Sequence, residues 1–241
     1  MQQIKEYNLK LLEVIQETPE VRLYRFRHPD DNEFNFYPGQ FMMVSFIDES
    51  EIKYARAYSI ASSPENKKYI EMGLDKVAKF TARMFELKGG EILKLKGPYG
   101  KFYFSPEMKN NLVLIGGGTG ITPLMSIARY CTDKELSNKI KLIYSVKTPE
   151  HIIYKDEYEK LKHQNKNFDC TITITRPEES QNEWNGRAGR IDLELIKHSV
   201  DDVKGSIYFL CGPNEFVKNI IFMLESIGVM KEQIKTDIWG S

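Results

Sequence analysis

Two different patterns of hydrophobic and polar residues occupy the two parts of the chain, and they change near residue 105. Before that point, short stretches rich in β-branched and aromatic residues are separated by turn residues, including those at 37–40 and 97–100. Apolar and basic residues partly alternate over residues 21–26, as in a strand with one buried face. The pattern predicts a helix over residues 80–87 and strands over residues 7–15, 21–28, 41–47, 56–61, 68–74 and 92–96. Such an arrangement is typical of a small antiparallel β-barrel.

Beyond residue 110 the alternation gives way to continuous apolar runs followed by helical stretches. Strands are predicted over residues 112–115, 140–146, 170–175, 207–210 and 234–239. Helices are predicted from a glycine-rich segment through residue 130, around residues 154–163 and over residues 214–227. Strands that alternate with helices indicate βαβ units and a parallel sheet. The sequence therefore predicts two domains, an antiparallel β-barrel over residues 1–105 and an α/β parallel-sheet domain over residues 106–241, which meet at the segment 105–110.

The composition narrows the class of protein. With 241 residues, of which 41% are hydrophobic and 28% charged, the chain can bury a sizeable core. Lysine plus arginine and aspartate plus glutamate are equal at 34 each, which argues against a nucleic-acid-binding surface and a polybasic membrane anchor. No apolar run approaches the roughly 18 residues of a membrane span, and the first residues mix charges where a signal peptide has an apolar stretch. A soluble, cytoplasmic protein is therefore expected.

The cysteines and histidines exclude several kinds of metal site. Cys131, Cys170 and Cys211 are far apart, so the sequence predicts neither a disulfide framework nor a zinc or iron–sulfur site held by local thiolates. The four histidines are equally scattered and form no HExxH motif, and no GxSxG motif is present. If the protein performs redox chemistry, its centre is expected to be a bound organic cofactor or the metal of a partner.

A glycine-rich segment follows the predicted strand 112–115. It reads Gly116, Gly117, Gly118, Thr119, Gly120. Such glycines allow backbone N–H groups to approach a ligand closely, and the start of a helix favours a phosphate. The segment is not a P-loop, because no Lys-Ser/Thr pair follows it, and Ile121 stands where GxGxxG has its third glycine. Its place at the first βα turn of the predicted sheet favours dinucleotide binding, and the alternative interpretation is a tight turn without a ligand.

A second candidate segment, Arg56-Ala57-Tyr58-Ser59, lies on a predicted barrel strand. Strand alternation is expected to place Arg56 and Tyr58 on one face and Ala57 and Ser59 on the other. An arginine can bind a phosphate through two hydrogen bonds, a tyrosine ring can stack on a flat heterocycle, and a serine hydroxyl can donate to a ring nitrogen. Taken alone, the segment is also compatible with an ordinary strand.

Together these motifs make the whole chain resemble the ferredoxin–NADP reductase family, nearly from end to end. The family's RxYS motif matches Arg56, Tyr58 and Ser59. The resemblance implies that Arg56 holds the FAD pyrophosphate, that Tyr58 stacks on the isoalloxazine ring, and that Ser59 lies near flavin N5. The family's GxxS/TxxL motif resembles residues 78–84, where Thr81 matches while alanine and methionine replace the glycine and the leucine. The backbone N–H groups implied to meet the pyrophosphate there belong to Lys79, Phe80 and Thr81.

The nucleotide motifs of the family also match. Its GxGT/SGxxP turn corresponds to the glycine-rich segment together with Pro123, and its CGP motif corresponds to Cys211, Gly212 and Pro213. By resemblance, Cys211 lies beside the nicotinamide C4. Relatives often end with Glu-x-aromatic. Here Asp237 takes the place of the acid, and Trp239 takes that of the aromatic residue, which either covers the flavin or packs against the sheet edge.

The resemblance implies a flavoenzyme that binds FAD and NAD(P)H and passes electrons to a ferredoxin, a flavodoxin or an oxygenase partner. Ser59, Cys211 and Asp237 are the predicted catalytic residues, which orient the rings and handle a proton rather than form covalent intermediates. Three alternatives remain open: a free-flavin or quinone reductase, a non-catalytic electron-transfer subunit of a larger complex, and a nucleotide-sensing module. No metal is predicted.

Two further features bear on the nucleotide and the partner. Thr175 and Arg176, with Arg187, are candidates for the 2′-phosphate of NADPH, although Glu178 and Glu179 lie close by in the sequence. Residues 52–104 contain 11 basic and 5 acidic side chains, which makes part of the barrel positively charged. The lysines that could form a docking face for an acidic ferredoxin or flavodoxin are Lys53, Lys67, Lys68, Lys94, Lys96 and Lys101. The alternative for these lysines is a set of solvated strand faces.

Overall fold

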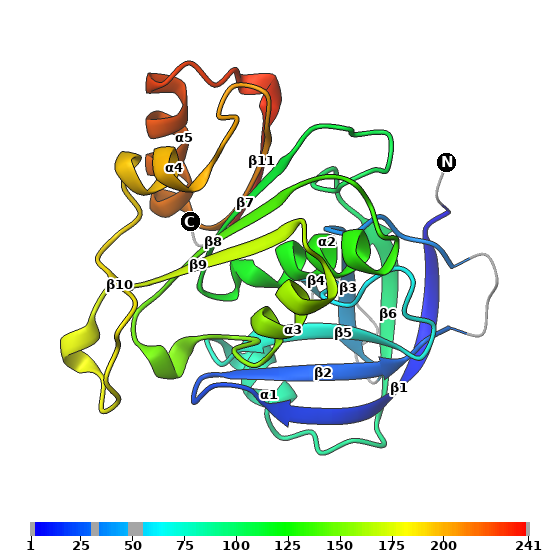
Figure 1. Ribbon diagram of the computed structural model, residues 1–241. Helices are drawn as coiled ribbons and strands as arrows, with labels where there is room; N and C mark the ends of the chain where they lie inside the picture. Colours follow the sequence, from blue (N-terminus) through cyan, green and yellow to red (C-terminus); the bar gives the residue numbers. More distant parts are fainter. Residues whose placement is uncertain (1–2, 30–33, 48–54, 240–241) are drawn as a thin grey trace.

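The computed structural model describes residues 3–29, 34–47 and 55–239 and contains two β-sheets that lie side by side (Figure 1). The first sheet is antiparallel and has the strand order β4-β3-β6-β1-β2-β5. Its strands are β1 (Lys5–Gln16), β2 (Val21–Arg27), β3 (Phe41–Phe46), β4 (Arg56–Ser59), β5 (Tyr69–Asp75) and β6 (Ile92–Tyr99). The Ala61 N–H donates to the Glu71 carbonyl at 2.7 Å, which joins the segment after β4 to the opposite edge of the sheet. The sheet is thus a nearly closed barrel, and the predicted antiparallel β-barrel is confirmed.

Of the two turns predicted in the barrel, one is present and the prediction of the other is wrong. The Gln40 N–H donates to the Tyr37 carbonyl at 3.1 Å, so the predicted turn at 37–40 is present. The second, at 97–100, is not a turn between strands, because β6 continues through Gly97-Pro98 to Tyr99. A β-bulge there places Tyr99 opposite Phe41 and Lys96 opposite Met43. A bulge tolerates a proline, which has no N–H to give to the ladder.

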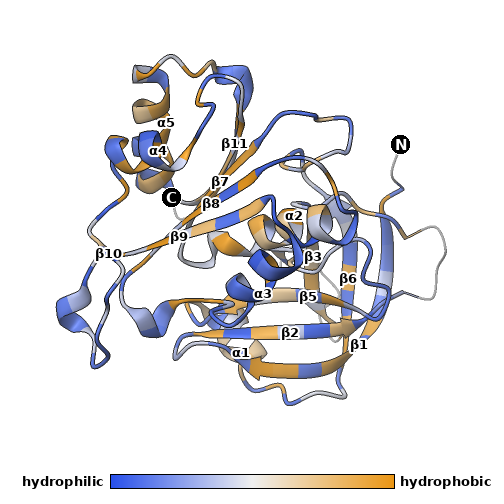
Figure 2. Cartoon of the chain, in the orientation of Figure 1, coloured by the Kyte–Doolittle hydropathy of each residue, from blue (hydrophilic) through white to orange (hydrophobic). Residues whose placement is uncertain are grey.

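The barrel core follows from the alternation seen in the sequence. Hydrophilic and hydrophobic bands succeed one another along β2 in Figure 2, and Tyr24 and Phe26 are buried in the barrel core while Arg25 between them is half-buried. The barrel core also contains Met42 and Val44 of β3. The helix α1 (Lys79–Met84) follows β5, and Met84 joins the same core.

The second sheet is parallel and has the strand order β10-β9-β8-β7-β11-β12. Its strands are β7 (Leu112–Gly117), β8 (Ile140–Val146), β9 (Phe168–Ile174), β10 (Arg187–Ala188), β11 (Ile207–Pro213) and β12 (Ile234–Trp239). The chain order of the strands reverses between β7 and β11, where the two strands pair in register from Ile207 opposite Leu112 to Cys211 opposite Gly116. Ligands of parallel sheets bind beyond the carboxyl ends of the strands at such a reversal point.

Helices cover both faces of the parallel sheet. They are α2 (Ile121–Asp133), α3 (Glu157–Gln164), α4 (Leu193–Ser199) and α5 (Asn214–Ser226). Alternate residues of β7 face the two sides: Leu112 and Leu114 join the core made with α2 and α3, whereas Val113 and Ile115 join the core made with α4 and α5. This three-layer arrangement explains why β7 is a continuous apolar run, because both of its faces are buried. The predicted α/β fold is confirmed.

The barrel and the parallel sheet share one of these cores. Leu23, Phe102 and Phe104 belong to the same buried cluster as the side chains of α2. The Phe102 ring packs edge-on against Phe209 of β11, with ring centroids 5.4 Å apart. Apolar burial therefore holds the two sheets against each other and places their strand ends at a common boundary. In the described residues, no helix is long and apolar enough to cross a membrane.

Candidate functional site

The segment Arg56–Ser59 forms the whole of strand β4, at one edge of the barrel sheet. Its register against β3 places Arg56 opposite Val44 and Tyr58 opposite Met42. Opposite residues of an antiparallel pair lie on the same face. Tyr58 is half-buried, while Arg56 and Ala57 are exposed. The segment thus offers a cation, an aromatic ring and the half-buried Ser59 along one short edge strand.

The helix α1 brings a second aromatic ring to Tyr58. Phe80 stacks on the Tyr58 ring, with centroids 6.0 Å apart and an angle of 27° between the ring planes. Burial raises the pKa of the Tyr58 hydroxyl above its ordinary value, so this ring is neutral at physiological pH. The two motifs that the sequence separates by about 20 residues are therefore in contact.

The start of α1 is built by Thr81. Its hydroxyl accepts hydrogen bonds from the Val77 and Ala78 N–H groups, both at 3.0 Å, and donates to the Ala78 carbonyl at 3.0 Å. Thr81 is buried, and Lys79 next to the turn is exposed. The motif residue Thr81 therefore shapes the turn through its side-chain hydroxyl. From the sequence, only its backbone N–H group was expected to contribute, as a donor to the pyrophosphate.

The glycine-rich turn runs from the last residues of β7 through a 3₁₀ turn (Gly118–Gly120) into α2. Gly118 has φ +57°, and a Cβ there would meet no atom within 4 Å. The backbone at this point borders open space, whereas a Cβ at Gly116 would lie 2.9 Å from a Leu124 methyl carbon. The Tyr144 hydroxyl donates to the Gly118 carbonyl at 3.0 Å and fixes the turn. Pro123 lies in the first turn of α2, where a missing N–H costs little.

The end of β11 lies beside this turn. Cys211 pairs with Gly116 on one side and with Asp237 of β12 on the other. Its thiol Sγ lies 3.8 Å from Asp237 Oδ2. Both Gly117 and Gly212 face the ring of Phe216, because a Cβ on either would lie within 3.3 Å of it. The third residue of the motif, Pro213, ends the strand and is exposed.

Burial sets the protonation of the Cys211–Asp237 pair. Desolvation, together with the nearby charge of Asp237, raises the pKa of the Cys211 thiol well above its ordinary value. Desolvation also raises the pKa of Asp237, and the hydrogen bond from the thiol opposes that rise. The geometry therefore favours a neutral thiol that donates to the carboxyl group, not a thiolate nucleophile.

Two cavities connect these segments across the boundary between the sheets. The first, of about 300 Å³, is lined by the glycine-rich turn and by Ser145, Lys147, Thr175 and Pro213 from the strand ends. Thr18, Val21 and Asp75 of the barrel close its other side. We call it the nucleotide cavity. Asp75 ends β5, three residues before the α1 motif begins. The barrel segment that leads into the proposed flavin motif thus borders the same cavity as the glycine-rich turn.

The second cavity, of about 280 Å³, lies between Phe41, Gly100 and Phe102 of the barrel and Thr236 and Asp237 of β12. Of the three predicted catalytic residues, Asp237 lines this crevice directly, while Ser59 and Cys211 lie on the adjacent strands, Ser59 opposite Phe41 and Cys211 opposite Asp237. The segment Arg56–Ser59 lines neither of the two cavities. The side chain of Trp239 lies outside the described residues.

The cations predicted for a 2′-phosphate have carboxylate partners. Arg176 forms an exposed ion pair with Glu179 at 3.3 Å, and Arg187 pairs with Asp192. Thr175 and Lys147 line the nucleotide cavity, and Lys147 forms no ion pair within the described part of the chain.

The predicted lysine face is divided. Lys68 lines a cleft between β5 and α3, and Lys101 lines the crevice beside Asp237. Lys94 pairs with Glu6 at 3.2 Å and Lys67 donates to a backbone carbonyl, while Lys96 is half-buried on β6. Lys53 lies outside the described residues. The lysine of this set that faces the crevice is thus Lys101.

Sequence reasoning missed several residues of the site. His151 and Phe216 line the nucleotide cavity, as does Thr18 from the turn between β1 and β2. No motif contains these residues, and they reach the cavity only through the packing of the two sheets. Asp75 had a signal, because it ends a strand directly before the α1 motif. Among residues 3–29, 34–47 and 55–239, no cluster of His, Cys, Asp and Glu could hold a metal ion.

Comparisons with known proteins give the family of the chain. Residues 8–104 match the family described as "Oxidoreductase FAD-binding domain", and residues 114–221 match the "Oxidoreductase NAD-binding domain". The chain is therefore an FAD- and NAD-binding protein of the oxidoreductase class. It belongs to the ferredoxin–NADP reductase family of flavoprotein reductases.

Curated relatives are longer than this chain. It is 30% identical over 226 residues to one subunit of the Na(+)-translocating NADH-quinone reductase of Marinomonas sp., and the match covers 88% of this chain and 53% of that protein. It is 29% identical over 238 residues to a glycine betaine monooxygenase reductase subunit of Chromohalobacter salexigens, covering 98% of this chain and 64% of that protein. The chain thus spans between about half and two thirds of the length of these relatives.

Solved structures share the fold. The ferredoxin reductase in carbazole 1,9a-dioxygenase superposes with a TM-score of 0.83 at 25% identity, covering 98% of this chain and 70% of that one. A ferredoxin NADP+ reductase from Neisseria gonorrhoeae, with bound FAD and NADP, superposes with a TM-score of 0.79 at 24% identity, covering 98% of each chain.

Proposed function

We propose that the protein is an FAD-dependent reductase, which takes a hydride from NAD(P)H onto FAD and passes the electrons to a protein acceptor such as a ferredoxin or a flavodoxin. The observation that carries this proposal is the placement of the motifs along the boundary between the two sheets. The glycine-rich turn lines the nucleotide cavity, Asp237 lines the second cavity, and Ser59 pairs with Phe41, which lines that same second cavity. We also propose that the domain boundary lies near residue 105.

The residues of the barrel fit an FAD molecule. The Tyr58 ring provides a flat apolar surface for an isoalloxazine ring, and its hydroxyl stays neutral. Arg56 supplies a planar cation for the pyrophosphate, together with the backbone N–H groups at the start of α1. The exposed Lys79 stands next to these N–H groups and adds a positive charge. FAD, when bound, supplies an acceptor for two electrons that can leave together or singly.

The nucleotide cavity fits a dinucleotide phosphate. Gly118 places the backbone against open space at the start of α2, where the helix dipole favours an anion. Thr119 and Gly117 line the same cavity. The Phe216 ring leaves no room for a side chain at Gly117 or Gly212. Glycine at both positions therefore lets this ring pack against the strand ends of β7 and β11, beside the cavity.

The three predicted catalytic residues would act by position. Cys211 presents a neutral S–H group at the end of β11. The thiol donates to the Asp237 carboxylate, and the charge of that carboxylate helps to keep the proton on the sulfur atom. Ser59 lies on the strand paired with Phe41, which lines the cavity that Asp237 also lines. A productive approach needs the reacting atoms within about 3–3.5 Å, which makes orientation the main task of these side chains.

We infer that NADPH is the preferred donor, because cations stand at the ends of β8 and β9. Lys147 lines the nucleotide cavity directly. Arg176 follows Thr175 and would exchange its exposed partner Glu179 for a 2′-phosphate. The ratio of kcat/KM for NADPH and NADH tests this inference, with Arg176→Ala as the variant. A wild-type preference for NADH contradicts it, and an unchanged ratio in Arg176→Ala removes Arg176 from the account.

The proposed acceptor is a small acidic electron-transfer protein. Relatives of this chain are named as the reductase subunit of a monooxygenase and as part of a quinone reductase, and a structural relative is the reductase of a dioxygenase. In this chain Lys101 stands at the crevice beside Asp237, where a positive charge can attract an acidic partner towards the cofactor.

Spectroscopy of the purified chain tests the proposal. The protein is expected to be yellow, with about one FAD per chain and an absorption band near 450 nm. Anaerobic mixing with NADPH or NADH should bleach that band, and ferredoxin or flavodoxin should then restore it faster than free FMN or a quinone does. A folded but colourless protein contradicts the proposal, and so does a flavin that neither nucleotide reduces. If a quinone reoxidises the flavin faster than ferredoxin and flavodoxin do, the acceptor is a quinone and not an electron-transfer protein.

A further inference from the structure

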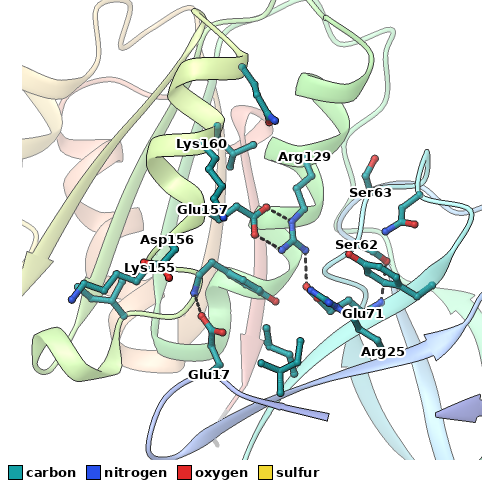
Figure 3. A pocket seen from close by; sticks show the side chains of 18 of the residues that line it. Glu17, Arg25, Ser62, Ser63, Glu71, Arg129, Lys155, Asp156, Glu157 and Lys160 are labelled. Carbon is teal, nitrogen blue, oxygen red and sulfur yellow. Dashed lines mark hydrogen bonds and ion pairs between the residues drawn. The ribbon is translucent and has the colours of Figure 1, made fainter. Parts of the chain in front are cut away.

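A large cleft of about 1020 Å³ opens beside the second half of α2, where Arg129 and Asp133 line it. Strands β2 and β5 of the barrel form one wall, and helices α2 and α3 form the other (Figure 3). Four charged side chains cross this cleft in a chain, two from the barrel and two from the helices. They are Arg25, Glu71, Arg129 and Glu157.

Arg129 is the centre of this chain. Its guanidinium group binds Glu157 of α3 through two hydrogen bonds of 2.6 Å. The same group donates to Glu71 of β5 at 2.8 Å and to the Ala61 carbonyl at 2.7 Å. Glu71 also accepts a hydrogen bond from Arg25 at 2.8 Å. A single planar fork thus bridges two helices of the nucleotide domain and two segments of the barrel.

This fork is buried at its Glu71 end, whereas its Glu157 end borders the cleft, where the Glu157 side chain is 29% exposed. The Glu71 side chain is 1% exposed and the Arg129 side chain 15%. Burial alone would raise the pKa of Glu71, but the charge of Arg129 and the hydrogen bonds from both arginines lower it. Both partners are therefore ionised, and their hydrogen bonds are directional and strong.

A second side chain of α2 acts in the same place. Ser126, one turn before Arg129, donates from its hydroxyl to the Ser62 carbonyl at 2.8 Å and is fully buried. The two acceptor carbonyls belong to Ala61 and Ser62, which follow β4 (Arg56–Ser59) after one residue, Ile60. We call β4 the flavin strand, because it carries the Tyr58 ring that is proposed to contact the flavin. The helix that begins at the glycine-rich turn is thus hydrogen-bonded to the backbone that continues from the flavin strand.

We propose that Arg129, assisted by Ser126, is a positioning residue for hydride transfer, which fixes the flavin strand against the nucleotide-binding helix so that the two rings meet at reacting distance. The inference rests on the proposed function. An apolar contact alone permits sliding, whereas a fork with several acceptors defines one relative placement. A displacement of about 1 Å can slow a reaction by roughly 100-fold.

Two variants separate this role from general stabilisation. Arg129→Lys keeps the positive charge but has no planar fork, so it cannot hold Glu157, Glu71 and the Ala61 carbonyl together. Ser126→Ala removes one hydrogen bond and keeps the helix. Cys131→Ala is the matched control, because Cys131 is buried on the same helix and its side chain makes no polar contact with the barrel in the described residues.

Anaerobic stopped-flow reduction at saturating nucleotide gives the first readout. We expect the limiting rate of flavin bleaching to fall about 10-fold or more in Arg129→Lys and about 3-fold in Ser126→Ala. The apparent Kd for the nucleotide and the flavin content should change less than about 2-fold, and Cys131→Ala should keep the wild-type rate. The weak long-wavelength absorbance of stacked nicotinamide and flavin rings should decrease with the rate.

Hydrogen exchange of the protein without cofactors gives a readout independent of activity. The amides of residues 60–63 and 71 are expected to exchange about 10-fold faster in Arg129→Lys than in the wild type, and to be unchanged in Cys131→Ala. If Arg129→Lys does not fold, Ser126→Ala decides the question by the same two readouts. Wild-type rates in the folded variants overturn the inference, as does a loss of flavin that parallels the loss of rate. A wild type that no nucleotide reduces would instead refute the proposed function.

Discussion

Gly118 combines a backbone conformation that favours glycine with an empty space where a Cβ would stand. Gly118→Ala therefore tests the turn without causing a clash. Its left-handed φ costs an alanine about 1 kcal/mol, and its methyl group would occupy the space left for a phosphate. We expect the KM for the nucleotide to rise about 10-fold or more, with unchanged flavin content. Steady-state kinetics and the 450 nm band measure both effects.

Gly90 provides the control for this variant. It also has a positive φ, of +104°, and a Cβ there would likewise meet no atom within 4 Å, but it lies before β6, away from the glycine-rich turn. Gly90→Ala should lower the melting temperature without changing the KM for the nucleotide. An equal rise of KM in both variants would contradict a phosphate site at Gly118.

Cys211 is expected to react slowly as a nucleophile. Burial and the neighbouring Asp237 raise the pKa of its thiol, so the thiolate is scarce at pH 8. Iodoacetamide should modify Cys211 about 10-fold or more slowly in the folded protein than in urea, as mass spectrometry of the cysteine peptides can measure. Rapid modification of the native protein at neutral pH would show a thiolate and contradict the neutral S–H donor.

At the scale of elements, the start of α1 depends on one hydroxyl. Thr81→Val removes the hydroxyl that accepts from the N–H groups of Val77 and Ala78, and the Val77 N–H keeps its hydrogen bond of 3.2 Å to the Asp75 carbonyl. We expect a loss of about 1–2 kcal/mol of stability and an increase of about 10-fold in the Kd for FAD, because the N–H groups of this turn move. Thr81→Ser keeps the hydroxyl and should restore both. Fluorescence titration of the protein without cofactors with FAD measures the Kd, and wild-type affinity in Thr81→Val would contradict this role.

The elements with regular patterns could be predicted from the sequence. The expected strand 140–146 and the expected strand 234–239 have the observed bounds, and the strand expected at 21–28 ends one residue earlier. Alternation and apolar runs report burial, and burial decides these strands. The helix α1 spans Lys79–Met84 rather than the expected residues 80–87. The Thr81 side chain defines its beginning, and beyond Met84 the N–H groups of Glu86 and Leu87 donate only three residues back, so the α-helical pattern ends.

Two short elements were not predicted. The strand Arg187–Ala188 has two residues and forms by pairing with Thr173 and Ile174, a partner far away in the sequence. The helix Leu193–Ser199 is too short for a clear period, although Asp192 caps it by accepting a hydrogen bond from the Leu195 N–H at 2.7 Å. An aspartate directly before Leu193, with Glu194 in the first turn, is a helix-start signal that was present in the sequence.

At the scale of the whole molecule, Glu71 links stability to pH. Its pKa is lowered in the folded protein, so its contribution is fully present above the unfolded carboxyl pKa of about 4.3 and is lost as the pH falls through the folded value. Glu71→Gln breaks a buried ionic contact and should cost about 3 kcal/mol at pH 7. We expect this difference from the wild type to shrink below about pH 4.

Urea denaturation at pH 7 and at acid pH measures that difference. Burial raises the pKa of Glu17, which lines the same cleft, and this carboxyl contributes a pH dependence of stability with the opposite sign. Because Glu17 is present in both proteins, the difference in stability between variant and wild type is the quantity to compare. A stability difference independent of pH would contradict an ionised Glu71 in the folded protein.

The candidate site was predictable where its residues follow strand ends. Gly116 and Cys211 both lie at the carboxyl ends of parallel strands, and such ends share one edge of the sheet. The contacts between the sheets were not predictable. Arg129 and Glu71 are 58 residues apart, and neither belongs to a local pattern, so only the packed fold reveals that they meet. The roles of the site residues remain predictions.

In the function proposed here, a nicotinamide bound at the glycine-rich turn faces a flavin bound at Tyr58. Anaerobic single-turnover reduction with a nucleotide that carries deuterium on one or the other face of C4 tests it most directly. We expect bleaching of the flavin band, with a primary isotope effect for one face only, because one fixed arrangement presents one hydrogen to the flavin. Bleaching with no isotope effect on either face in a step limited by chemistry, or no bleaching at all, would contradict it.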